Sequence, residues 1–157
     1  MTLTKASLKE FIYAANLAGY ASGNEVHWAK EPDGSTTIIY EKGKLKYHDN
    51  FFGGEPYGGR IIVSYNKHPT WIMVYYGEVK VKNVNVVYEI LRRALLHIPK
   101  ALPLRGPKRY QEKNFIYSNS PCGKLTHFSG VEIITKNNKI IYQAAYSGGL
   151  VDTRTGV

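Results

Sequence analysis

A series of short β-rich runs, each closed by a turn sequence, constrains the fold more than any other feature of this chain. Valine, isoleucine, threonine and aromatic residues are frequent in these runs, and Pro-Asp-Gly, Lys-Gly or Asn-Lys-His-Pro separates consecutive ones. Strands joined by such tight turns pair as antiparallel hairpins. We therefore expect an antiparallel meander whose strands are 26–30, 36–41, 44–52, 60–65 and 70–82.

Two helices are indicated by apolar residues at helical spacing. The first contains Leu8, Phe11, Ile12 and Ala15. Thr4 or Ser7 is expected to cap it and Gly19 to end it, because hydroxyl side chains suit a helix start and glycine suits a helix end. The second is predicted over 86–97 and ends before Pro99, which cannot continue a helix.

More strand follows a proline-containing loop near residue 100. The expected strands are 114–119, 127–135 and 139–146. Asn137 and Asn138 join the last two, and asparagine tolerates the positive φ angles of a type I′ turn. The prediction is an α+β fold in which two helices pack on a curved antiparallel sheet of roughly seven or eight strands.

The size and composition fit one globular domain over residues 1–157. The chain is 43% hydrophobic and 13% aromatic, which is too apolar for a disordered protein. No run of about 18 apolar residues occurs, so no membrane-spanning helix is expected. The first 19 residues carry Lys5, Lys9 and Glu10 and lack the apolar stretch of a signal peptide, which favours a cytoplasmic protein.

The net charge of +9 lies entirely in the second half of the chain. Residues 1–78 hold eight basic and eight acidic side chains, whereas residues 79–157 hold thirteen and four. A basic segment at 92–113 could bind nucleic acid through counterion release, with Tyr110 available for stacking on a base. Its nucleic-acid candidates are Arg92, Arg93, Lys100, Lys108, Arg109 and Lys113. The alternative is an ordinary solvated helix face followed by a basic loop.

No complete catalytic or metal-binding signature is present. The five histidines are far apart in the sequence, and Cys122 is the single cysteine, so no metal site and no cofactor are expected. No Gly-x-Ser-x-Gly motif occurs, and the glycines between 53 and 59 lack the Lys-Ser/Thr of a phosphate loop. A third hypothesis is an enzyme that uses Asp49 or Glu132 with a nearby histidine.

Aromatic residues next to glycines form the one pattern that points to a binding site. Such pairs can line a pocket, because glycine permits close approach and aromatic rings provide flat walls. Arg105, followed by Gly106 and Pro107, is the expected anchor for a small anionic ligand. The predicted ligand-binding residues are Arg105, Asp49, Phe52, Trp71, Tyr76 and Glu132.

Two considerations limit that prediction. Strand alternation allows only one of Tyr75 and Tyr76 to face the pocket. The same glycine and aromatic pairs also serve to build a strongly curved sheet, and Arg105 alternatively holds a carboxylate such as Asp49 or Glu55.

Several of these motifs also carry a family resemblance. In chain order they are Asp49-Asn50-Phe51-Phe52-Gly53-Gly54, Trp71-Ile72-Met73-Val74-Tyr75-Tyr76-Gly77, Leu104-Arg105-Gly106-Pro107, Phe128-Ser129-Gly130 and Gly148-Gly149-Leu150. Together they resemble a family of uncharacterised prokaryotic domains of unknown function, some fused to an N-terminal helix-turn-helix module. The resemblance implies the sensor or effector half of a regulator. Because this sequence begins directly with the helix around Phe11, we expect no DNA-reading module in it.

Overall fold

The computed structural model describes residues 3–20 and 27–153 and contains one antiparallel sheet. The predicted α+β class is confirmed, but nine strands form the sheet rather than seven or eight. Their order across the sheet is β1-β2-β3-β4-β5-β9-β8-β7-β6. The strands are β1 (His27–Lys30), β2 (Thr36–Lys42), β3 (Leu45–Phe52), β4 (Tyr57–Tyr65), β5 (His68–Val79), β6 (Arg109–Glu112), β7 (Phe115–Lys124), β8 (His127–Lys136) and β9 (Lys139–Leu150).

Strand β6 is the one that the sequence pattern missed. Its four residues, Arg-Tyr-Gln-Glu, lie in the basic segment, and its partner is β7. A short, charged strand is typical of a sheet edge, where it discourages pairing with other chains. Such a strand lacks the alternation of apolar and polar residues by which strands are predicted. Strand β4 also begins three residues earlier than expected, at Tyr57.

Helix α1 (Lys5–Tyr20) begins with a reciprocal cap. The backbone N–H of Ser7 donates to Thr4 Oγ1, and the N–H of Thr4 donates to Ser7 Oγ, each over 3.1 Å. Both orphan donors are thereby satisfied, as in a capping box. The prediction that Gly19 ends the helix is wrong, because the helix continues through it. Glycine is a weak stop where no left-handed φ angle is required.

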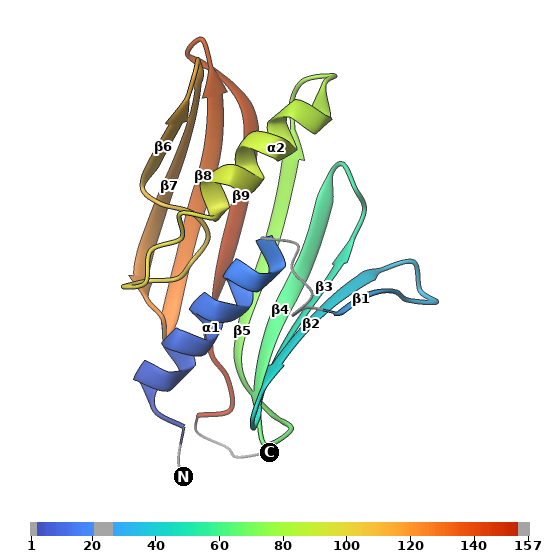
Figure 1. The fold of residues 1–157 in the computed structure, drawn as a ribbon, viewed down its shortest axis with the longest axis vertical. Coiled ribbons are helices and arrows are strands. Elements are labelled where there is room, and N and C mark those ends of the chain that lie inside the picture. Colours follow the sequence, from blue (N-terminus) through green and yellow to red (C-terminus); the bar gives the residue numbers. More distant parts are fainter. Residues whose placement is uncertain (1–2, 21–26, 154–157) are drawn as a thin grey trace.

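Both helices cover the same face of the sheet (Figure 1). The four apolar residues predicted for α1 are all buried, and they pack in a cluster with residues of β3, β4 and β5. Helix α2 (Val84–Leu95) buries Val87, Ile90, Leu91 and Ala94 in a second cluster with β7, β8 and β9. No helix in the described residues is long and apolar enough to cross a membrane.

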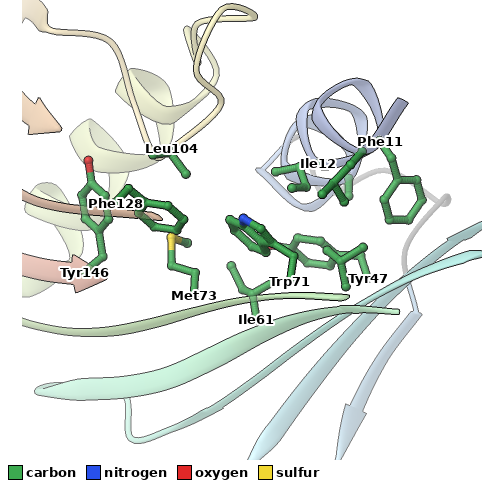
Figure 2. Close-up of a cluster of buried hydrophobic side chains, with 12 residues drawn as sticks. Phe11, Ile12, Tyr47, Ile61, Trp71, Met73, Leu104, Phe128 and Tyr146 are labelled. Atoms are coloured by element: carbon green, nitrogen blue, oxygen red, sulfur yellow. The ribbon is translucent and has the colours of Figure 1, made fainter. Parts of the chain in front are cut away.

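Trp71 lies at the centre of the first cluster (Figure 2). Phe11 and Ile12 of α1 approach it from one side, and Phe128 and Tyr146 lie on the other. The Trp71 and Phe128 rings stack with centroids 5.4 Å apart, and the indole N–H donates to the Leu125 carbonyl over 2.9 Å. The cluster therefore joins both halves of the sheet where β5 pairs with β9.

Candidate functional site

A cavity of about 350 Å³ lies between the inner face of the sheet and the two helices. Aromatic side chains form much of its lining: Trp28, Tyr47, Phe51, Tyr57, Tyr75 and Tyr88. Leu91 and Leu95 of α2 and Ile38 of β2 add aliphatic surface. Among the described residues, the charged groups on the lining are Asp49, Arg92 and Arg105. This is the arrangement expected of a small-molecule site, where a few polar groups are placed in an apolar hollow.

Asp49 projects from β3 into this lining and is half-buried. The Tyr75 hydroxyl donates to its Oδ1 over 2.5 Å, and no other residue in the described part of the chain hydrogen-bonds its carboxyl group. Burial raises the pKa of Asp49 to about 6, although the Tyr75 hydrogen bond and the charge of Arg105 both act to lower it. A carboxylate in such surroundings carries an unusual free-energy cost when it is ionised.

Arg105 lies in the loop between α2 and β6 and is buried. Its Nε and Nη2 atoms donate to Oε1 of Glu132 over 2.9 and 2.5 Å, and Glu132 is fully buried on β8. The guanidinium carbon also lies 6.0 Å from the centroid of the Tyr75 ring. The backbone of Arg105 has a φ of 64°, a conformation that costs free energy for a residue with a side chain.

Tyrosine hydroxyls complete the coordination of Glu132. Tyr117 donates to its Oε2 over 2.6 Å, and Tyr142 donates to its Oε1 over 2.8 Å. Tyr57 and Tyr142 share a hydroxyl hydrogen bond of 2.6 Å, and Tyr57 must be the donor because the Tyr142 proton already points to Glu132. Burial raises the pKa of Tyr117 and of Tyr142, so both remain protonated donors.

The glycine and aromatic pairs have a packing role in this sheet. Tyr57 is opposite Gly77 across β4 and β5, and a Cβ atom at Gly77 would lie 2.7 Å from the Tyr57 hydroxyl oxygen. Tyr146 and Gly130 are paired in the same way across β8 and β9, where the added Cβ would lie 2.2 Å from the ring. The missing side chains make room for aromatic rings that lie over the neighbouring strand.

The structure separates the six predicted ligand-binding residues into four groups. Asp49 and Arg105 line the cavity, and Glu132 lies behind it as the partner of Arg105. Trp71 is 1% exposed and belongs to the core. Phe52 and Tyr76 are 50% and 56% exposed and are not part of the lining, because Phe51 and Tyr75 are the members of each pair that face inward.

Other lining residues were not predicted from the sequence. Tyr57, Tyr75 and Phe51 could have been found by extending the strand alternation from the apolar residues beside them, since Ile61, Val63 and Met73 are buried. Tyr47 lies on the same face of β3 as Phe51 and is paired with buried Val63, so the same reasoning would have found it. Trp28 had no such signal, because the four-residue strand β1 has no buried residue to mark its inward face. None of the lining residues in the described part of the chain is a histidine.

The basic segment contains several side chains that already have protein partners. Arg93 donates to Glu112 through Nε and Nη2 over 2.7 and 3.0 Å. Tyr110 stacks on His97 with ring centroids 5.1 Å apart and donates its hydroxyl to Glu112. Lys100 lies over the ring of Tyr13. The four residues Arg92, Lys108, Arg109 and Lys113 are exposed, and nucleic-acid binding by this segment stays a prediction.

The raised pKa of Asp49 predicts a specific pH dependence of stability. The folded protein holds the Asp49 proton up to about pH 6, whereas the unfolded chain releases it near 3.8, so this residue lowers the free energy of unfolding as the pH rises between those values. Asp49→Asn should therefore stabilise the protein at pH 7.5 by about 3 kcal/mol and have no such effect below about pH 4. Urea unfolding across pH measures the difference. Exposed Glu41→Gln is the control, and a gain that persists at pH 4 would contradict the assignment.

A family model for a domain of unknown function (DUF5680) matches residues 49–151, which is more than half of the chain. The chain belongs to the DUF5680 family. The DUF5680 match begins at Asp49 and includes Arg105 and Glu132, whereas α1, β1 and β2 precede it. The predicted resemblance to a family of unknown function is thus confirmed. No curated protein and no solved structure matches the chain.

Proposed function

We propose that this protein binds a small organic molecule in the cavity between α1, α2 and the inner face of the sheet. The observation that carries the proposal is the combination of an aromatic hollow of about 350 Å³ with Asp49 and Arg105 on its lining. Its volume lies in the range typical of ligand pockets, and its walls are apolar enough to bury most of such a ligand.

The charged end of the cavity is assembled around the Tyr75 ring. The Tyr75 hydroxyl donates a hydrogen bond to Asp49, and the face of the Tyr75 ring lies toward the Arg105 guanidinium. A ligand would place its apolar part between the aromatic walls and its polar part against Asp49 and Arg105. Glu132 weakens the expected ion pair between Arg105 and an acidic ligand, since two of the guanidinium donors already bind the Glu132 carboxylate.

Filling the cavity from α1 is the direct test of this proposal. Gly19 lines the cavity, and a Cβ atom built there meets no atom within 4 Å, so a side chain can start at this position without a clash. Gly19→Phe should leave the fold intact, because glycine is itself unfavourable within a helix. We expect it to reduce the affinity for cavity ligands at least about tenfold, a loss of 1.4 kcal/mol.

The measurement is isothermal titration calorimetry with 1-naphthalenemethanol and 1-naphthylmethylamine. Ala6→Phe is the matched control, because it adds the same ring to an exposed position of the same helix. Binding that is equally strong in the wild type and in Gly19→Phe would place the ligand elsewhere and would contradict the proposal.

A further inference from the structure

We infer that the cavity selects an organic cation, namely an aromatic or apolar molecule with a protonated amine that pairs with the Asp49 carboxylate. This inference rests on the proposed function and specifies the class of ligand. It replaces the anionic ligand suggested by the sequence, and it is drawn from the charges and hydrogen-bond donors around the cavity.

Asp49, Arg105 and Glu132 together give the charged end of the cavity a negative net charge when Asp49 is ionised. Arg105 and Glu132 form a buried pair with a closest approach of 2.5 Å, so the positive charge is compensated within the protein. Asp49 has no basic side chain bonded to its carboxyl group in the described residues. The three groups together carry −1 when Asp49 is ionised and zero when it is protonated. An anion meets a favourable net charge in neither state, whereas a cation does so when Asp49 is ionised.

The tyrosine hydroxyls around this end donate their protons to protein acceptors. Tyr75 donates to Asp49, and Tyr57 donates to Tyr142. At the rim, Tyr88 donates to Glu55 and to the Gly54 carbonyl. The second Asp49 oxygen therefore remains as an acceptor on the lining that a ligand N–H can reach. A ligand donor can bond that oxygen, for which the described residues supply no hydrogen-bond donor.

The aromatic lining favours the same class of ligand. A ring face attracts a cation within about 6 Å of its centroid, and several aromatic side chains surround this hollow. Aromatic walls with a carboxylate are a common solution for binding organic ammonium groups. Among the described lining residues, Arg92 is the one positive charge besides Arg105, and it is exposed on α2, where water screens its repulsion of a cationic ligand.

A matched series of three naphthalene compounds tests the inference. The compounds are 1-naphthylmethylamine, 1-naphthalenemethanol and 1-naphthoate, which share one ring system and are cationic, neutral and anionic at pH 7.5. We expect calorimetry to give the amine at least about tenfold higher affinity than the alcohol, with the carboxylate weakest. Asp49→Asn keeps an acceptor for Tyr75 but removes the charge, so it should abolish the preference for the amine and retain binding of the alcohol.

The possible results separate this inference from the function on which it rests. If the carboxylate binds best, or if Asp49→Asn keeps the preference for the amine, the inference is wrong but the cavity remains a ligand site. If no member of the series binds, both the inference and the proposed function fail. Glu41→Gln, which removes an exposed carboxylate, should behave as the wild type and excludes a general effect of net charge.

Discussion

Arg105→Ala is expected to lower the free energy of unfolding by about 3–5 kcal/mol, because it leaves the Glu132 carboxylate charged and buried without its cation. Native domains are stable by only about 5–15 kcal/mol, so this variant loses a large share of its stability. Urea unfolding followed by circular dichroism measures the change. The result also bears on ligand experiments, since loss of binding in Arg105→Ala would reflect a damaged fold as much as a lost contact.

The exposed ion pair of Arg93 and Glu112 provides a control of the same chemistry. It too has two N–H···O hydrogen bonds, but the Arg93 side chain is 44% exposed. Arg93→Ala should therefore cost no more than about 1 kcal/mol. A double variant, Arg105→Met with Glu132→Leu, should lose less stability than the sum of its single variants, because no uncompensated charge remains. Equal losses for Arg105→Ala and Arg93→Ala would contradict the assigned role.

Trp71→Ala is expected to cost a comparable 3–5 kcal/mol, but for a different reason. The indole is fully packed between α1 and the sheet, and its removal leaves a void and an unpaired Leu125 carbonyl (Figure 2). Because Trp71 does not line the cavity, the variant that remains folded at low temperature should bind 1-naphthylmethylamine as the wild type does. Thermal unfolding and calorimetry on the same samples measure the two effects.

Trp28 is the matched control for this experiment. It lines the cavity and is 50% exposed. Trp28→Ala should therefore change stability by less than about 1 kcal/mol and weaken ligand binding, the reverse of the Trp71 pattern. If Trp71→Ala retained full stability and lost only binding, the placement of this side chain in the core would be wrong.

The fold was largely predictable because turn residues and the spacing of apolar residues mark most of its elements locally in the sequence. Turn residues marked most hairpins, and Asn137 and Asn138 adopt φ angles of 49° and 62°, as expected of a type I′ turn. The charged edge strand β6 was missed because its residues have no apolar alternation. The pairing of β5 with β9 was not predicted, since strands 71 residues apart at their first residues carry no turn signal.

The site was predictable only in part, because it depends on register and on distant contacts. Asp49 and Arg105 were named from the sequence, and both line the cavity. Phe52 and Tyr76 were chosen from the sequence instead of their neighbours Phe51 and Tyr75. This error of one residue in each strand places the chosen side chains on the opposite face of the sheet, where they are exposed. The pairing of Arg105 with Glu132 rather than Asp49 or Glu55 arises from tertiary packing across 27 positions.

A crystal structure with 1-naphthylmethylamine would show directly whether the hollow between the helices and the sheet is a ligand site. We expect the naphthalene ring to lie among Phe51, Tyr57 and Tyr75, with the ammonium nitrogen within hydrogen-bond distance of Asp49. A ligand bound on the outer face of the sheet, or a soaked crystal whose cavity holds only water, would contradict the proposed ligand site.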